Sequence, residues 1–433
     1  MRDRTELQFV LETTTRCGGS CQGCFLSSSE RTGGGLWPDE TFERVGRFIG
    51  GYIDAHLEVD DPKEISINLG QGDHLLAGPE RLSNIIRWIH TAGRGRAVGF
   101  MTASAIGRTA RVMAAVDAVR RTSLEIGQPV IFDLVLDPAK TSLPKFKDTY
   151  SANINYIRQA FGGVDLHINV GPDTLAAVTP HGLLSFLAES RIRRFSLNLT
   201  PTRRTAELFH AAWGRITDWI CEFLERWDPA CGVEINVGQV LSAALEGADE
   251  LRDEGLPALA GIVTNAAGRT VYLNGDGMIY HLQAGVGDIA CCDRVGLHSA
   301  VPMPADDSMA RSAAMKSAGL LAHRAVAFTK TNRACRSCDF ATVCPRIGAV
   351  AIGMAMEGRM SGGCPSGLYP VLETIRKGVR AGLKSKFAAK TSVTHLPTGF
   401  ALGFLPNGVP FEEPASYIRL DMLSSARAPE REA

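Results

Sequence analysis

The stretch LQFVLETTTRCGGSCQGC, from Leu7 to Cys24, joins an apolar, β-branched run to three closely spaced cysteines. The run predicts a β-strand, and Cys17, Cys21 and Cys24 follow it on a glycine-rich segment. Thiolates at this spacing are typical ligands of zinc or of an iron–sulfur cluster. A structural zinc site needs four ligands, whereas a cubane cluster held by three thiolates keeps one iron open. The trio therefore predicts either half of a zinc site or a cluster that binds a further molecule.

The composition is that of an ordinary globular protein, with 45% hydrophobic and 21% charged residues among 433. Lys plus Arg and Asp plus Glu number 46 each, which argues against a nucleic-acid partner. The N-terminal residues do not read as a secretory signal, and the longest apolar stretch, GAVAIGMAM, is too short to span a bilayer. The eleven cysteines lie in tight groups rather than in a disulfide framework. We expect a cytoplasmic protein with reduced thiolates and no membrane contact.

The first half of the chain alternates strand-like runs with helical patterns. The predicted strands begin at Leu7, Glu64, Arg96, Pro129, Val164 and Arg193. The predicted helices span residues 39–57, 79–93, 107–127, 151–163, 180–190 and 206–227. Such alternation predicts a parallel sheet with right-handed crossovers, either an open doubly wound sheet or a partial barrel. In both folds the active-site residues lie at the C-terminal ends of the strands, where the cysteine trio begins.

The pattern changes after Trp227. GVEINVGQV predicts one more strand, and RTVYLNGDGMIYHLQ predicts a hairpin around Asn274 to Gly277. We place a boundary near Pro229. The division predicted from this is a first domain over residues 1–228, a cysteine-rich second domain over 229–375 and a partly disordered extension over 376–433.

The Cx3Cx2C spacing after the first strand resembles the signature of the radical S-adenosylmethionine (radical SAM) superfamily. The resemblance implies an α/β fold, a partial (β/α)6 TIM-like barrel followed by a small cysteine-rich C-terminal domain. It also implies a 4Fe–4S cluster on Cys17, Cys21 and Cys24, whose open iron binds S-adenosyl-L-methionine (SAM).

The family's GGEP element, which receives the SAM amino group, is matched in part by QGDHLL after the second strand. Gly72 keeps one glycine, and Asp73 stands in place of the acid. Gln71 replaces the other glycine and His74 replaces the proline. The alternative interpretation makes Gly72 an ordinary loop glycine and Asp73 a simple helix N-cap.

Three further polar residues are candidates for SAM binding by resemblance. Thr102 and Ser104 lie in FMTASAIG after the third strand, and Asn169 lies on the fifth. The alternative is that they are only polar residues at strand ends. The family's aromatic residue before the third cysteine is replaced here by Gly23. LVLDPAK resembles the family segment that ends the fourth strand.

A second cysteine group resembles the SPASM and twitch extensions of radical SAM enzymes. Cys335, Cys338, Cys344 and Cys364 match the ligand set of the outer auxiliary 4Fe–4S cluster. Structural zinc is the alternative occupant of a four-cysteine site. The next cysteine of the SPASM pattern is replaced by Gly348, so we expect the inner cluster to be degenerate or lost.

An inner site that combines His281 with Cys291 or Cys292 stays an alternative. Cys221 and Cys231 are interpreted as small buried hydrophobic residues.

The resemblance implies a radical SAM oxidoreductase that abstracts hydrogen from a peptide or protein side chain, with an external electron donor. One alternative is a dehydrogenase or epimerase that acts on a sugar or aminocyclitol. Another is a non-catalytic iron–sulfur or zinc sensor or scaffold. Acid–base residues cannot be assigned from the sequence; Asp133, His167 and Glu234 are inward-facing candidates on predicted strands.

Overall fold

The structure of the protein is a computed structural model. It describes residues 6–18, 28–57, 64–104, 109–141, 144–161, 163–192, 194–198, 206–228, 233–236, 270–280, 301–314, 316, 337–338 and 373.

Ten strands of the described chain form one sheet, in the order β10-β9-β8-β1-β2-β3-β4-β5-β6-β7. The first seven are β1 (Glu6–Thr14), β2 (Glu64–Gln71), β3 (Ala97–Ala103), β4 (Val130–Val135), β5 (Asp165–Asn169), β6 (Arg194–Asn198) and β7 (Glu234–Asn236). Each pairs in parallel with the next along the chain. The six predicted strands and the strand expected after Trp227 are therefore confirmed.

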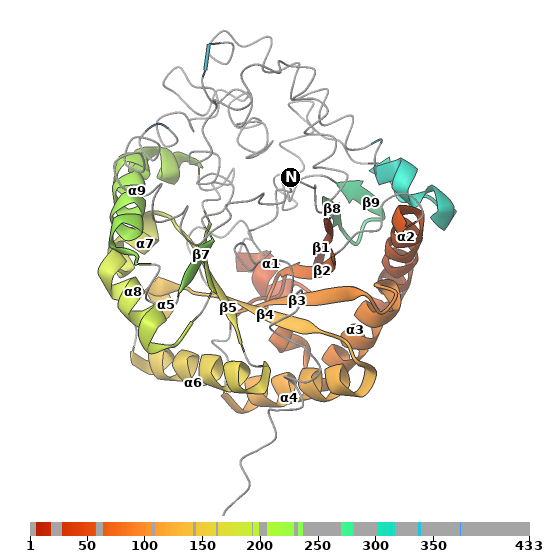
Figure 1. Ribbon diagram of the computed structural model, residues 1–433, viewed down its shortest axis with the longest axis horizontal. Coiled ribbons are helices and arrows are strands. Elements are labelled where there is room, and N and C mark those ends of the chain that lie inside the picture. Colours follow the sequence, from red (N-terminus) through yellow and green to blue (C-terminus); the bar gives the residue numbers. More distant parts are fainter. Residues whose placement is uncertain are drawn as a thin grey trace, which may run out of the picture.

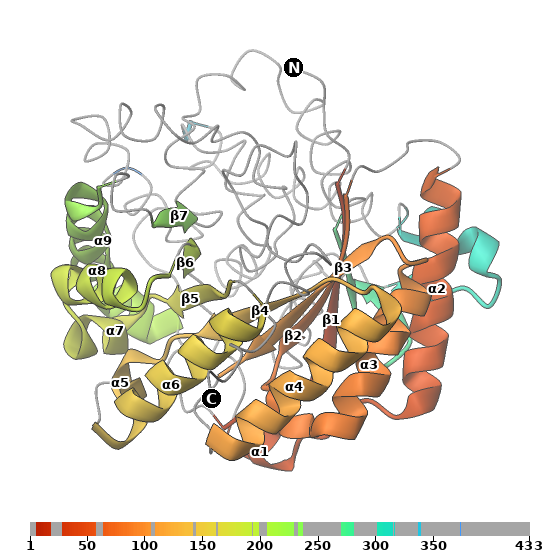
Figure 2. The ribbon, with the colours of Figure 1, turned by 60° about the horizontal axis from the view of Figure 1, so that its bottom comes forward.

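The long helices cover the outside of the curved sheet (Figures 1 and 2). They are α2 (Asp39–Leu57), α3 (Pro79–Ala92), α4 (Thr109–Ile126), α6 (Pro144–Phe161), α8 (Pro180–Glu189) and α9 (Ala206–Arg226). Strands in sequential order, joined by crossovers of one hand, place every helix on the same face. This arrangement is the curved, partial-barrel form of the α/β fold rather than the doubly wound form.

The pleat gives the sheet two chemically different faces. Leu11, Leu69, Met101 and Phe132 stand in one register row and are fully buried. This row faces the helices: a Cβ added to Gly99, which has the same parity as Met101, would contact a side chain of α3. Because strand side chains alternate between faces, the polar residues between these positions lie on the concave face.

Short helices were not predicted, because one or two turns show no periodicity. They are α1 (Ser28–Gly33), α5 (Pro138–Thr141), α7 (Pro172–Ala177) and the 3-10 helices η1 (His74–Ala77) and η4 (Asp307–Met309). Helix α6 begins at Pro144 rather than at the predicted residue 151. Proline at the first helical position is a start signal, since its missing N–H has no helical partner there.

Strands from beyond residue 229 extend the same sheet at both edges. The predicted hairpin is formed by β8 (Thr270–Leu273) and β9 (Met278–Tyr280), and β10 (Val301–Pro302) pairs with β9. Strand β8 runs parallel to β1. The division at residue 229 stays a prediction, and the sheet continues across it.

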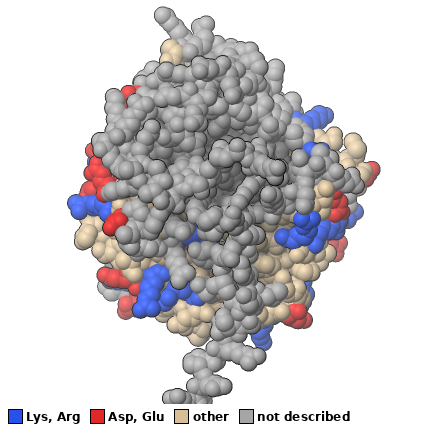
Figure 3. Space-filling model, viewed as in Figure 1, with Lys and Arg blue, Asp and Glu red and all other residues tan. Residues whose placement is uncertain are grey.

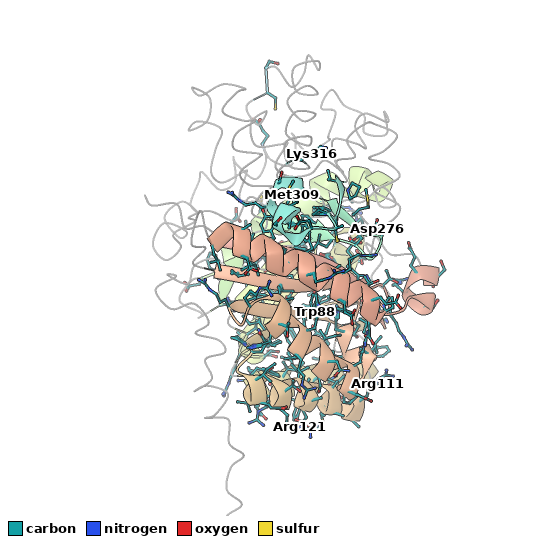
Figure 4. All side chains as sticks on the ribbon, turned by 90° about the vertical axis from the view of Figure 1, so that its right-hand side faces the viewer. Trp88, Arg111, Arg121, Asp276, Met309 and Lys316 are labelled. Carbon is teal, nitrogen blue, oxygen red and sulfur yellow. The ribbon has the colours of Figure 1, made fainter. Side chains whose placement is uncertain are left out.

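The β8–β9 turn is fastened to helix α2. Arg44 of α2 donates a hydrogen bond to the carbonyl oxygen of Gly275 at 2.8 Å. Gly277 has φ of 82°, a left-handed conformation that suits glycine in a tight turn. Figure 4 shows Asp276 of this turn and Met309 of η4 on the side of the molecule where α2 runs. Strand β8, which pairs with β1, thus supports the strand that leads into the segment carrying Cys17 (residues 15–18 of the described chain), called the cysteine segment below.

The surface of the described residues carries both signs of charge. In Figure 3, Lys and Arg side chains alternate with Asp and Glu around the rim. No helix within the described ranges has the length and apolar character needed to cross a bilayer.

Burial of the apolar face of the sheet should make the largest contribution to the free energy of unfolding. Phe132 is fully buried, with its ring centroid 5.2 Å from that of Phe161. We expect Phe132→Ala to lower the free energy of unfolding by about 3–5 kcal/mol, because it removes burial and leaves a cavity. The measurement is urea denaturation followed by circular dichroism. Met113→Ala, on the exposed side of α4, is the control and should change the free energy by less than about 0.5 kcal/mol. Equal effects of the two substitutions would contradict the assignment of the faces.

Candidate functional site

The cysteine segment leaves the C-terminal end of β1 and is held there by backbone contacts. The Trp37 amide donates to the carbonyl oxygen of Thr13 at 2.9 Å. The Cys17 amide donates to the carbonyl oxygen of Arg31, in α1, at 3.2 Å. Cys17 is partly exposed. Its thiol therefore lies at the C-terminal edge of the sheet, as predicted.

Cys21 and Cys24 lie outside the described residues, so the structure does not test the three-cysteine ligand set. A partly exposed thiol on a segment that follows a strand suits a metal or cluster ligand, because thiolates must be reachable by the metal.

Gly72 lies where the turn after β2 meets the cysteine segment. A Cβ added there would stand 2.6 Å from the carbonyl oxygens of both Thr14 and Arg16. The next amide, that of Asp73, donates to the Arg16 carbonyl at 2.8 Å. The absence of a side chain thus allows the two backbones to approach closely, so Gly72 is more than an ordinary loop glycine.

Asp73 and Ser104 are brought together, although they come from different strand ends. The Ser104 hydroxyl donates a hydrogen bond to Oδ2 of Asp73, and the Leu75 amide donates to Oδ1 at 3.2 Å. Asp73 is therefore the N-cap of η1, as its alternative interpretation held. Burial raises the pKa of this carboxyl, while the bonds from Ser104 and Leu75 oppose the increase. The backbone of Ser104 also donates to this carboxyl. A carboxylate has two lone pairs on each oxygen, so it can still accept a further donor.

His74 was noted in the sequence only as a replacement for proline, and the structure gives it two partners. Its Nε2 lies 2.5 Å from Oγ1 of Thr13, and its Nδ1 lies 3.0 Å from the carbonyl oxygen of Thr102. Burial lowers the pKa of His74 to about 4, so the ring is neutral at pH 7. No local sequence pattern could have revealed these contacts.

The ends of β4 and β5 complete the same edge. Lys140 of α5 donates from Nζ to the carbonyl oxygen of Gly18 at 2.7 Å, which ties the LVLDPAK segment to the cysteine segment. Asn169 ends β5, and its Oδ1 is buried without a hydrogen-bond partner among the described residues. A buried acceptor of this kind suits a polar ligand at the edge, because an unmet acceptor costs free energy.

Two buried pairs of titratable side chains lie on the concave face beside this edge. Nδ1 of His167 lies 2.9 Å from Oδ2 of Asp133, and Nε of Arg194 lies 3.0 Å from Oδ1 of Asp165. Burial raises the pKa of the Asp133 carboxyl, opposed by the charges of His167 and Arg194. The inward placement of Asp133 and His167 is confirmed. The side chain of Glu234 lies outside the described residues, although its backbone is part of β7.

Of the second cysteine group, the described residues include Cys338. Cys338 is partly buried and packs against the core. Cys335, Cys344 and Cys364 lie outside the described residues, as do His281, Cys291, Cys292 and Cys231.

Cys221, on α9, is less buried than predicted. Partial burial and the nearby Glu225 and Asp218 raise the pKa of its thiol to about 11. The thiol is therefore protonated at neutral pH, which makes it a poor metal ligand.

The chain matches known proteins by structure but not in searches by sequence. No protein-family model and no curated protein matches the chain. The solved structure of anSMEcpe with bound AdoMet and Cp18Cys peptide matches with a TM-score of 0.56, at 10% identity, over 88% of this chain and 98% of that one. The two proteins share a fold.

A second anSMEcpe structure, of the native protein with bound AdoMet, matches with a TM-score of 0.52, at 10% identity, over 88% of this chain and 98% of that one. SuiB of Streptococcus suis matches with a TM-score of 0.42, at 14% identity, over 64% of this chain and 60% of the SuiB chain. The anSMEcpe matches confirm the curved parallel sheet with outer helices that the resemblance implied.

The close approach at Gly72 should make this position intolerant of any side chain. We expect Gly72→Ala to lower the free energy of unfolding by about 1–3 kcal/mol, because the new Cβ would collide with two carbonyl oxygens. Urea denaturation measures the change. Gly35→Ala is the matched control, since a Cβ at Gly35 would meet no atom within 4 Å. A Gly72→Ala variant as stable as the control would contradict the geometry.

His74 should make stability fall on acidification. Its folded pKa, about 4, lies below the ordinary value of 6.5, so the unfolded chain takes up the proton first as the pH falls. The contribution of His74 is fully present above about pH 6.5 and should decline by about 2 kcal/mol between pH 7 and pH 5.

Urea unfolding of the wild type and His74→Asn at both pH values isolates this contribution. The raised pKa values of Asp73 and Asp133 act in the opposite direction, and both carboxyls are present in the two proteins. The variant should therefore lose less stability than the wild type. Equal losses would show that His74 is not buried in its neutral form.

Proposed function

We propose that the chain is a radical SAM enzyme that modifies a peptide or protein side chain. The observation that carries the proposal is the packing of the Gly72–Asp73 turn onto the segment that bears Cys17. The proposal is supported because the turn that would bind SAM contacts the described part of the segment that carries Cys17, at the C-terminal edge of a curved parallel sheet. The fold shared with anSMEcpe, solved with AdoMet bound, supports the same conclusion.

The chemistry of the donor set agrees with this assignment. Cys17, Cys21 and Cys24 would hold a 4Fe–4S cluster, and Gly72, Asp73, Thr102, Ser104 and Asn169 would bind SAM. When both are bound, they supply a 5′-deoxyadenosyl radical that removes a hydrogen atom from an unactivated carbon. Asp73 offers a buried carboxylate to an amino group, Ser104 holds that carboxylate in place, and Asn169 offers a buried acceptor.

A peptide or protein substrate is supported by the anSMEcpe structure with a bound Cp18Cys peptide. The cysteine-rich region of residues 229–375 would hold an auxiliary 4Fe–4S cluster on Cys335, Cys338, Cys344 and Cys364. An external donor would reduce the cluster on Cys17, and the cytoplasm is the compartment in which such thiolates stay reduced.

Anaerobic reconstitution with iron and sulfide, followed by dithionite and SAM, tests the proposal. The wild type should form 5′-deoxyadenosine, measured by liquid chromatography with mass spectrometry. Cys17→Ala should lower its formation more than about 100-fold, because two thiolates do not hold a cubane. Cys221→Ala is the matched control and should leave the rate unchanged, since this thiol is protonated and lies on α9.

A well-reconstituted wild type that forms no 5′-deoxyadenosine would overturn the enzymatic assignment in favour of a sensor or scaffold. Iron and sulfide contents of about eight each per chain would support two cubanes, and about four iron with one zinc would assign zinc to the second group.

The substrate class is tested with deuterated candidates. Transfer of deuterium from a peptide to 5′-deoxyadenosine supports a peptide-modifying enzyme. Transfer only from a sugar or aminocyclitol would replace it with a small-molecule dehydrogenase or epimerase.

A further inference from the structure

The imidazole of His74 joins the C-terminal ends of three neighbouring strands. His74 begins η1 just after β2, Thr13 belongs to β1 and Thr102 belongs to β3. The bonds at 2.5 Å to Thr13 Oγ1 and at 3.0 Å to the Thr102 carbonyl use both ring nitrogens. Both His74 and Thr13 are fully buried. The ring is therefore a bridge inside the protein and does not reach solvent.

The chemistry of the two partners fixes the proton on the ring. A carbonyl oxygen can only accept, so Nδ1 of His74 must carry the hydrogen that it donates to Thr102. The neutral ring then has no hydrogen on Nε2, which accepts from the Thr13 hydroxyl. Neither nitrogen is left to bind a metal or to exchange a proton with a substrate. A catalytic role for His74 itself is thereby disfavoured.

The bridge reaches β1 where its pairing with β2 is irregular. Leu11 pairs with Leu69, whereas Thr14 pairs with Gln71, so the register shifts between them. An extra residue of this kind is a β-bulge, which bends a strand and redirects its side chains. Thr13 lies within this shift, where the regular ladder does not fix the position of β1. The bond from Thr13 to His74 supplies a fixed contact there.

The three residues of the bridge, Thr13, His74 and Thr102, lie close in sequence to the predicted cofactor residues. Thr13 precedes Cys17 by four residues, His74 follows Asp73, and Thr102 precedes Ser104 by two. Asp73 and Ser104 are themselves hydrogen-bonded. A displacement of His74 would therefore shift the SAM-binding pair relative to the cysteine segment.

We propose that His74 is a positioning residue that, as the neutral Nδ1–H tautomer, sets the place of the cysteine segment relative to the SAM-binding residues Asp73 and Ser104. The inference rests on the proposed radical SAM function. It assigns to His74 a role in SAM affinity and geometry rather than in the chemical step.

Thr13→Val tests the bridge, because valine has the shape of threonine but cannot donate to Nε2. In the reconstituted protein we expect unchanged iron content and a Kd for SAM that is raised about tenfold, since small displacements at a binding site are costly. The SAM-induced change in the EPR spectrum of the reduced cluster should also differ from that of the wild type. A purely structural role would lower the melting temperature and leave this spectral change as it is.

Two variants serve as controls. Thr13→Ser keeps the hydroxyl and should restore the Kd to within about twofold of the wild type. Thr91→Val removes a hydroxyl that, among the described residues, bonds to the Arg87 carbonyl on the exposed side of α3, and it should leave the Kd and the spectrum unchanged. A Thr13→Val protein with the Kd and spectrum of the wild type would overturn the proposal.

The tautomer is measured independently of any cofactor. In the wild-type full chain labelled with 15N-histidine, long-range NMR spectra should show His74 as the Nδ1–H form with no titration between pH 6 and 8; the His74→Asn spectrum assigns the signal. An Nε2–H form, or titration in this range, would overturn the inference even if Thr13→Val does not fold.

The two proposals fail separately. A wild type that forms no 5′-deoxyadenosine would remove the proposed function. If the wild type forms 5′-deoxyadenosine and Thr13→Val has the Kd and spectrum of the wild type, only the proposed role of His74 is removed.

Discussion

The close approach of two backbones at Gly72 is the contact on which the candidate site depends. The turn after β2 lies so near the carbonyl oxygens of Thr14 and Arg16 that a single methyl group would not fit between them. The Asp73 amide then bonds to one of these carbonyls. Two loops that would otherwise move independently become one unit, and Asp73 takes its place beside the cysteine segment.

The sheet can present this unit because its two faces differ in chemistry. The face towards the helices is apolar and fully buried at Leu11, Leu69, Met101 and Phe132, so hydrophobic burial holds the scaffold. The concave face carries polar groups. The Arg194 guanidinium buried there is paired with Asp165, because an unpaired buried charge would cost several kcal/mol. A rigid apolar layer thus supports a polar one in which ligands and protons can be held.

Hydrogen bonds across strand ends convert this scaffold into a site. Ser104 fixes Asp73, and Lys140 fixes the cysteine segment through Gly18. His74 links Thr13 with Thr102. The bonds of Ser104 and His74 are buried, where hydrogen bonds are strong and each unmet group would be costly, whereas the Lys140 bond is exposed. The result is a preorganised edge, which is what tight binding of a small charged cofactor requires.

Strands β1 to β7, the long helices, the β8–β9 hairpin and the place of Cys17 could be predicted from the sequence, because each follows from a local pattern. Strand β10 and the first residues of α6 were missed. Alternation, helical periodicity and turn residues act over a few neighbours. The polar residues that contact one another could be identified only from the folded structure. Thr13 and His74 are 61 residues apart, and Gly18 and Lys140 are 122 apart. The folded structure also decided that strands beyond residue 229 complete both edges of the sheet. Such contacts depend on how strands are ordered and curved in space, which no local pattern records.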